Sequence, residues 1–210
     1  DIVAILPNSC GRGYGLFIPD EKSLDWIMEN FSTLSDDLLR QSLIITLNEC
    51  YKNEIVTPTE WLNFILRYID TEPNYLIAST LNGYLGEVMI IAGDHSAEEV
   101  LWQIISNRHN PSLCRRLTMT LAHTMTSTSS IERLYTIWEQ VSGIQLDEQD
   151  YTTLAYELAL RLPTQAEAIL TTQRARISNP DRIAQFDYIS RATTADIAER
   201  KALFEWLLND

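Results

Sequence analysis

Signals that start helices recur along most of this 210-residue chain, and they constrain its fold more than any other feature. Thr57-Pro58-Thr59-Glu60 combines an N-cap threonine, a proline at the first helical position and the glutamate of a capping box. Asn179-Pro180 repeats the first two elements, and Asp147 can cap a helix that runs to residue 162. Between such signals the apolar residues have helical spacing, as in residues 35–52. We therefore expect short helices joined by short turns.

Further starts and stops complete this pattern. Capping boxes are predicted at Ser96-Ala97-Glu98-Glu99 and at Thr164-Gln165-Ala166-Glu167, and Gly143 and Pro163 are predicted to follow helix ends. Only seven glycines and seven prolines are present, about half the usual usage. The chain should hold about ten or eleven helices of roughly 10–18 residues.

The spacing of these helices predicts their architecture. Starts of alternate helices fall roughly 35–40 residues apart, as in helix-pair solenoids. No repeated consensus accompanies this spacing, so it describes an architecture only. We expect an all-α fold of the HEAT/ARM type, a helical superhelix or α-solenoid, over residues 20–210.

Residues 1–19 have a different pattern. Ile2, Val3, Ile5 and Leu6 favour a strand, turn-forming residues follow, and apolar residues return at 16–18. This pattern predicts a short N-terminal β-hairpin. Gly11-Arg12-Gly13-Tyr14-Gly15 is interpreted as the turn of this hairpin, because it lacks the continuation of a phosphate-binding loop. One hairpin is not stable alone in water. It either packs on the helices or is the edge of a preceding β-domain, and the start at Asp1 suggests a chain cut from a longer protein.

Charge and composition exclude several partners. The net charge of −13 and the pI near 4.6 predict repulsion of nucleic acid. The longest apolar run, near residues 84–92, is shorter than the roughly 20 residues of a membrane span. We therefore expect neither a nucleic acid nor a membrane as partner. The three cysteines form no CxxC and no disulfide framework, which predicts buried or idle thiols.

Catalytic and metal-binding motifs are missing from the sequence. A zinc peptidase helix needs two histidines one turn apart and a glutamate, and His95, His109 and His123 do not have this spacing. No G-x-S-x-G elbow is present. We expect no catalytic residue, no metal ligand and no cofactor in this chain. His123 is predicted to be a satisfied core histidine, and the five widely spaced tryptophans are predicted to pack between helices.

A basic stretch stands out in this acidic chain. Residues 173–192 contain four arginines (Arg174, Arg176, Arg182 and Arg191) and two aspartates. One interpretation is a solvated helix face. The other is a cationic patch that holds an anionic group such as the C-terminal carboxylate of a peptide, which arginine can grip with two hydrogen bonds.

Several segments, in the right order, resemble the helical C-terminal domain of M1-family zinc aminopeptidases (aminopeptidase N-like). The first looks like the end of that family's small β-domain, and the others look like its early and closing helices. They are Leu6-Pro7-Asn8 with Gly11-Arg12-Gly13-Tyr14-Gly15, Leu34-Ser35-Asp36-Asp37-Leu38-Leu39-Arg40, Thr57-Pro58-Thr59-Glu60-Trp61-Leu62, Asp150-Tyr151-Thr152-Thr153-Leu154-Ala155-Tyr156-Glu157-Leu158-Ala159 and Ile177-Ser178-Asn179-Pro180-Asp181-Arg182.

The resemblance implies a supporting role. Zinc would lie in a separate catalytic domain, since this chain lacks the family's H-E-x-x-H, third-ligand glutamate and G-A-M-E-N motifs. The partners would be the catalytic and β-domains of the parent chain and a peptide substrate. Arg182, Asn179 and Arg176 would then be candidate substrate contacts. The alternative is a free-standing helical-repeat scaffold that binds a protein partner. An independent enzyme would need catalytic residues from distant segments that no motif reveals.

Overall fold

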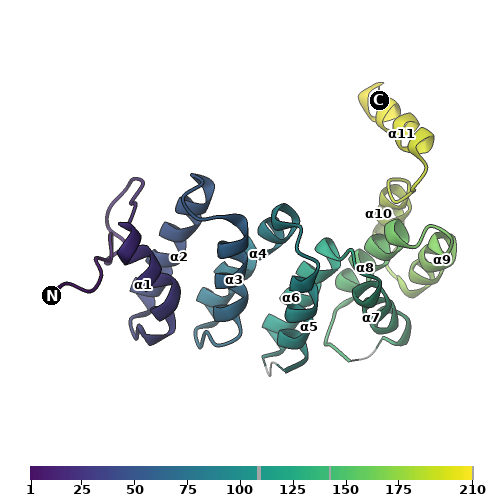
Figure 1. Cartoon of the computed structure of the whole chain (residues 1–210). Helices are drawn as coiled ribbons and strands as arrows, with labels where there is room; N and C mark the ends of the chain where they lie inside the picture. The colour runs from purple at the N-terminus through teal and green to yellow at the C-terminus, as the bar shows by residue number, and fades with distance from the viewer. Residues whose placement is uncertain (108–109, 142, 210) are drawn as a thin grey trace. The chain divides into compact units, whose positions relative to one another are not determined.

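The computed structural model describes residues 1–107, 110–141 and 143–209. Within these ranges it contains eleven α-helices of 10 to 18 residues, one 3-10 helix and no strand (Figure 1). The prediction of an all-α chain is therefore confirmed. The chain divides into two compact units, Asp1–Thr124 (unit 1) and Met125–Asp210 (unit 2), which are described separately.

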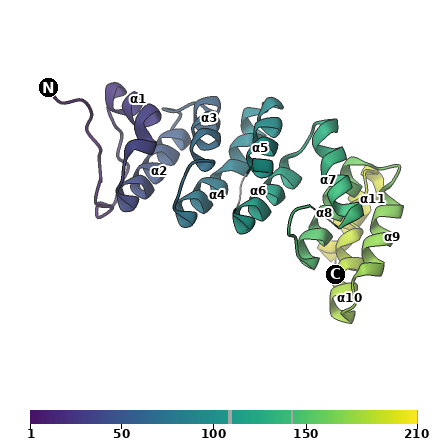
Figure 2. The ribbon, with the colours of Figure 1, turned by 90° about the horizontal axis from the view of Figure 1, so that it is seen from below.

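Unit 1 is a row of helices in which sequence neighbours and next-but-one neighbours pack together. Helix α3 contacts α4, α4 contacts α6, and α5 contacts α6. In Figure 2 these helices lie side by side in chain order. Its elements are α1 (Glu21–Asn30), η1 (Phe31–Thr33), α2 (Asp37–Lys52), α3 (Pro58–Ile69), α4 (Tyr75–Ala92), α5 (Ser96–Asn107) and α6 (Pro111–Thr124).

Aromatic side chains form the centre of unit 1 near α3. Phe64 lies 5.2 Å from Phe31, 5.3 Å from Trp61 and 4.7 Å from Tyr68, measured between ring centroids. All four rings are buried. The Tyr68 hydroxyl donates to the carbonyl of Met28 at 2.9 Å, whereas the buried Trp61 Nε1 has no hydrogen-bond partner among the described residues. The cluster joins α1, η1 and α3.

An ion pair is buried beside this cluster. Arg40 of α2 donates from Nε and Nη2 to the two carboxylate oxygens of Glu72, at 3.0 and 2.9 Å. Both residues are about 5% exposed or less. Arg40 also donates to Asp37 Oδ1 and to the carbonyl of Leu34, and Glu72 Oε1 accepts from the N–H of Asn74. This network fixes the loop between α3 and α4 against the start of α2.

Helix α4 has the length and apolar composition of a membrane span, and it is the one such helix in the described part of the chain. One third of that 18-residue window is buried inside unit 1. The helix packs against α3 on one side and α6 on the other. Core helices of globular proteins share this composition.

Gly83 lies in the interior of α4 and faces open space, because no atom lies within 4 Å of the position that a Cβ would take. Glycine in a helix interior costs roughly 1 kcal/mol relative to alanine. We expect Gly83→Ala to raise the free energy of unfolding by roughly 0.5–1 kcal/mol in urea denaturation. Gly93→Ala is the matched control. Gly93 caps the same helix at φ +62°, so alanine there should destabilise the chain. Equal effects at both sites would contradict this reasoning.

Unit 2 is held together by contacts between consecutive helices. Helix α7 packs on α8, α8 on α9, and α9 on α10. Trp138 Nε1 donates to Gln173 Oε1 at 2.9 Å, and Gln173 Nε2 donates to Thr152 Oγ1 at 3.2 Å, so a buried network links three helices. The elements are α7 (Thr128–Gln140), α8 (Glu148–Arg161), α9 (Ala166–Arg176), α10 (Pro180–Ser190) and α11 (Ile197–Asn209).

Three predicted helix starts are confirmed and two are wrong. Thr57 and Asp147 form capping boxes with Glu60 and Asp150, and Asn179 caps α10. Thr164 is not a cap, because a turn after α8 delays the next helix to Ala166 and leaves Gln165 as N-cap without a side-chain bond. Ser96 is instead the first residue of α5, and its N–H donates to Asp94 Oδ1.

The N-terminal β-hairpin is not formed. Residues 1–19 contain a turn at 7–10 and no strand. The segment is held by side chains of the helices instead. Ser42 Oγ donates to the carbonyl of Asn8 at 2.7 Å, and the Ile5 N–H donates to Ser23 Oγ at 2.8 Å. The prediction failed because strand-favouring residues form a ladder only where a second strand supplies the hydrogen bonds.

The histidine and tryptophan predictions have mixed outcomes. His123 lies on α6 as expected but is exposed, so its prediction as a core residue is wrong. His109 lies outside the described residues. Trp61 and Trp138 are buried as predicted, whereas Trp206 on α11 is 39% exposed. Cys50 and Cys114 are buried and Cys10 is exposed.

Candidate functional site

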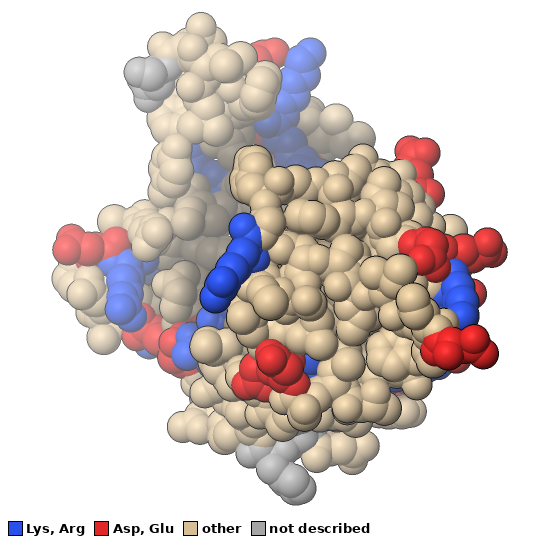
Figure 3. Space-filling view, turned by 90° about the vertical axis from the view of Figure 1, so that its left-hand side faces the viewer, with Lys and Arg blue, Asp and Glu red and all other residues tan. Residues whose placement is uncertain are grey.

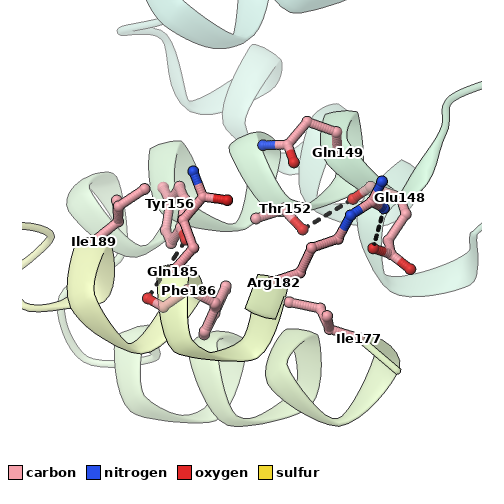
Figure 4. A pocket seen from close by; sticks show the side chains of 9 residues that line it. All are labelled: Glu148, Gln149, Thr152, Tyr156, Ile177, Arg182, Gln185, Phe186 and Ile189. Carbon is pink, nitrogen blue, oxygen red and sulfur yellow. Dashed lines mark hydrogen bonds and ion pairs between the residues drawn. The ribbon is translucent and has the colours of Figure 1, made fainter. Parts of the chain in front are cut away.

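A small groove between α8 and α10 contains the arginine that the sequence singled out (Figure 4). We call it the α8–α10 groove. Both helices begin at the same end of it, because Glu148 is the first residue of α8 and Arg182 lies in the first turn of α10. The lining residues are Glu148, Gln149, Thr152, Tyr156, Ile177, Arg182, Gln185, Phe186 and Ile189.

Arg182 is engaged in an ion pair across the groove. Its Nη1 donates to Glu148 Oε1 at 2.6 Å, with 54% of the arginine side chain and 35% of the glutamate side chain exposed. The hydrogen bond to Glu148 raises the pKa of Arg182. This pair joins the first turns of two helices, and solvent screens it.

The other end of the groove is aromatic. Tyr156 stacks on Phe186, with ring centroids 5.2 Å apart and planes 24° apart. Its hydroxyl donates to the carbonyl of Phe186 at 3.5 Å. Thr152 lies between the two ends and donates to the carbonyl of Glu148. The groove therefore offers a charged end, two exposed glutamine amides and an apolar end.

Asn179 and Arg176 do not line the groove. Asn179 Oδ1 accepts the N–H groups of Asp181 and Arg182, at 2.9 and 3.3 Å, so its side chain caps α10. The Arg176 guanidinium donates to the carbonyls of Trp138 and Glu139 at the end of α7. It also lies 4.7 Å from the Trp138 ring centroid. Of the three predicted contacts, the structure places only Arg182 in this groove.

The other two arginines of the basic stretch also have partners. Arg174 forms a two-bond ion pair with Asp187, at 2.6 and 2.8 Å, and Arg191 lies 4.4 Å from the Trp206 ring centroid. Near Arg182 the carboxylates of Asp147 and Glu148 make the local electrostatic potential more negative. An anionic ligand at Arg182 must therefore take the place of Glu148.

Sequence reasoning missed Glu148 and Tyr156, whose contacts join the two sides of the groove. Glu148 and Tyr156 lie 34 and 30 residues from the groups they contact. The spacing of alternate helix starts was the one available signal, because it predicts which helices become neighbours. It does not predict which side chains face each other.

The pKa of the Tyr156 phenol, which lines the groove, can be tested by titration. Burial and the nearby charge of Asp187 raise its pKa to about 12 from the ordinary 10.0. The neutral phenol is favoured in the folded state, so this contribution to stability is complete below pH 10 and disappears as the pH rises from 10 to about 12. Ultraviolet titration should show one phenol that ionises near pH 12, and Tyr156→Phe should remove that step. An unchanged titration curve in the variant would contradict the assignment.

Metal ligands do not cluster in the described ranges 1–107, 110–141 and 143–209, where no three His, Cys, Asp or Glu side chains are grouped to hold an ion. Comparison with protein-family models, curated proteins and solved structures finds no match for this chain.

Proposed function

We propose that this chain is the non-catalytic helical domain of a zinc-dependent aminopeptidase of the M1 type. In this proposal it packs on the catalytic and β-domains of the parent protein and encloses the chamber that receives peptides. The parent removes N-terminal residues with a zinc-bound water held in the catalytic domain. The motif resemblance is one support, and the remaining supports come from the surface and the helix arrangement.

One observation carries the packing role. Helix α11 buries none of its residues, and Ile197, Phe204 and Leu208 are each more than 60% exposed. Apolar side chains so close together on one helix are typical of an interface. Contact with another domain of the same protein would cover them.

The spacing of the helices within each unit supports a HEAT-like arrangement, which is part of this proposal and suits the enclosing role. Alternate helices of unit 1 begin at Asp37, Tyr75 and Pro111. Their side chains bond at a near-constant separation, since Gln41 and Thr80 are 39 residues apart and Asn82 and Thr120 are 38 apart. In unit 2 the Trp138–Gln173 bond spans 35 residues. Repeated pairs of this kind build extended walls.

Activity of the complete gene product tests this function. We expect it to release the N-terminal residue from aminoacyl nitroanilides and to lose that activity with a zinc chelator. The open reading frame upstream of Asp1 should encode H-E-x-x-H. The 210-residue chain alone should be inactive. A complete gene product without that motif and without activity would refute the proposal.

The same enzyme tests the proposed substrate contact at Arg182. If its guanidinium binds a peptide carboxylate, Arg182→Ala should raise KM for short peptides about tenfold, as expected for a lost charge-assisted hydrogen bond. Glu148→Gln should lower KM, because it removes the competing carboxylate. Arg174→Ala is the matched control and should leave KM unchanged, since Arg174 pairs with Asp187. Unchanged KM in Arg182→Ala would eliminate the contact.

The second candidate is a free-standing repeat scaffold for a protein partner, which the regular helix pairs also favour. Stable scaffolds end in capping helices with a polar outer face. Helix α11 exposes Ile197, Phe204 and Leu208, so its outer surface is not uniformly polar. This observation favours the domain of a larger enzyme.

A further inference from the structure

A second pocket lies in unit 1, at the end of the helix row where α3 ends and α2 begins (Figure 1). It opens between residues 31–35, which run from η1 toward α2, and residues 71–73, which follow α3. Its volume is about 340 Å³, which is within the usual range for small-molecule sites. We call it the α2–α3 pocket.

Buried side chains form the inner wall of the α2–α3 pocket. The Arg40–Glu72 ion pair holds the loop of residues 71–73 against α2, and its two residues are 5% and 4% exposed. Phe31 and Tyr68 complete this wall, with ring centroids 5.1 Å apart, and both are almost fully buried. A wall that is ordered before a ligand arrives loses little conformational entropy on binding.

The charges of the lining favour a cation. Asp37 and Glu72 each carry −1 and Arg40 carries +1, so the lining has a net charge of −1. Arg40 is already engaged, since it donates to Glu72, to Asp37 and to the carbonyl of Leu34. The surface around α1 has only scattered lysine and arginine side chains to offset this charge (Figure 3). The local field therefore attracts a cation and repels an anion.

Asp37 presents the accessible carboxylate of this pocket. Its side chain is 57% exposed, whereas that of Glu72 is 2% exposed. Oδ1 accepts from Arg40 and Oδ2 accepts from Asn74 Nδ2, both at 2.6 Å, and the bond from Asn74 lowers the pKa of Asp37. The group is therefore ionised at neutral pH. A carboxylate has about four lone-pair sites, so Asp37 can accept further donors.

Hydroxyl groups surround the mouth of the pocket. Four exposed residues carry them: Ser32, Thr33, Ser35 and Thr71. Thr33 Oγ1 donates to the carbonyl of Asn30 at 2.7 Å, and its oxygen keeps its lone pairs as acceptors. The mouth thus offers several acceptors around one negative charge. A primary ammonium is a compact cation with three donors, and it matches this set.

We propose that the α2–α3 pocket binds a primary ammonium group on a short alkyl chain, carried by a free amine or by the lysine side chain of a protein partner. The ammonium donates to the Asp37 carboxylate and to hydroxyls of the mouth. The alkyl chain packs on Leu34 and Pro73, which also line the pocket. The Arg40–Glu72 pair positions the two loops. This site does not rest on the aminopeptidase function, because every group that forms it belongs to unit 1.

An NMR titration of the 210-residue chain tests this site. n-Pentylamine, which is cationic at neutral pH, should bind with a Kd of roughly 1–10 mM, an ordinary affinity for so small a ligand. The amide shifts should be confined to residues 31–40 and 68–74. 1-Pentanol has the same alkyl chain with a neutral hydroxyl and should bind at least about tenfold more weakly. Equal affinities for the two probes, shifts spread over the acidic surface or the lack of saturable shifts with n-pentylamine would overturn the proposal.

Three variants locate the binding charge. Asp37→Asn keeps the size of the side chain and should raise the Kd for n-pentylamine about tenfold. Ser35→Lys places a competing ammonium at the mouth and should abolish saturable binding. Asp187→Asn is the matched control and should leave the Kd unchanged, since Asp187 is also an exposed aspartate paired with an arginine but belongs to unit 2. Equal weakening in Asp37→Asn and Asp187→Asn would contradict the site, as would an unchanged Kd in both Asp37→Asn and Ser35→Lys.

N-acetyl-lysine amide distinguishes the two sources of the ammonium. Tighter binding than that of n-pentylamine would identify the lysine side chain of a protein partner, and weaker binding would identify a free amine. Either result supports the pocket as an ammonium site. Amine binding is measured without peptidase activity, so the site and the proposed enzyme can fail separately.

Discussion

Glu72→Ala should lower the free energy of unfolding by about 3 kcal/mol or more, because it leaves the buried Arg40 guanidinium without its main partner. Both side chains are almost fully buried, and two hydrogen bonds join them. Asp37 retains one contact with Arg40 and cannot compensate for both lost bonds. Urea denaturation followed by far-ultraviolet circular dichroism measures the change.

An exposed ion pair provides the control for this result. Asp187→Ala removes the partner of Arg174, and both side chains of that pair are about half exposed. Solvent screens such pairs, so Asp187→Ala should cost far less stability than Glu72→Ala. Equal costs for Glu72→Ala and Asp187→Ala would show that burial does not determine the contribution of these pairs.

Phe64→Ala should cost about 3–5 kcal/mol, the range for removing a large aromatic side chain from a close-packed core. Phe64 is 2% exposed and touches the rings of Phe31, Trp61 and Tyr68. The substitution leaves a cavity where α1, η1 and α3 meet. Thermal and urea denaturation should both detect the loss.

Two further variants control for the chemistry of this substitution. Phe64→Leu keeps most of the volume and should cost roughly 1.5 kcal/mol or less. Phe204→Ala makes the same change at a side chain that is 61% exposed and should alter stability in the chain alone by no more than about 0.5 kcal/mol. A loss at Phe204 as large as that at Phe64 would mean that α11 is packed in solution.

The features that could be predicted from the sequence are those whose partners lie within one helical turn, such as helix caps. The Thr57 capping box was predictable because both partners lie within one helical turn, and the structure forms both of its bonds, at 3.2 and 2.8 Å. The same rule failed at Thr164. There the N–H of Gln165 bonds to the carbonyl of Leu162 in a turn after α8, and the helix begins one residue later than the motif implied.

Features that depend on distant residues could not be predicted. Arg40 and Glu72 are 32 residues apart, and Arg182 and Glu148 are 34 apart. Helix periodicity places each arginine on a face, but the side chain opposite it depends on how neighbouring helices are rotated. For that reason the sequence left open whether the basic stretch is a solvated helix face or a cationic patch, whereas the structure gives each of its four guanidinium groups a partner.

Helix α11 also has a consequence for the thermodynamics of association. Its attachment to the rest of unit 2 includes Trp206, which lies near Tyr188 and Arg191, and the helix has only 13 residues. Isolated helices of this length are marginal in water. In the chain alone, α11 should therefore exchange with unfolded conformations at little cost.

A partner that covers Phe204 and Leu208 would have to order the helix as it binds, so part of the favourable contact energy would be offset by lost conformational entropy. Affinity would then depend on helix propensity as well as on contact area, and a substitution such as Glu199→Gly, on the exposed surface, would weaken binding without touching the partner.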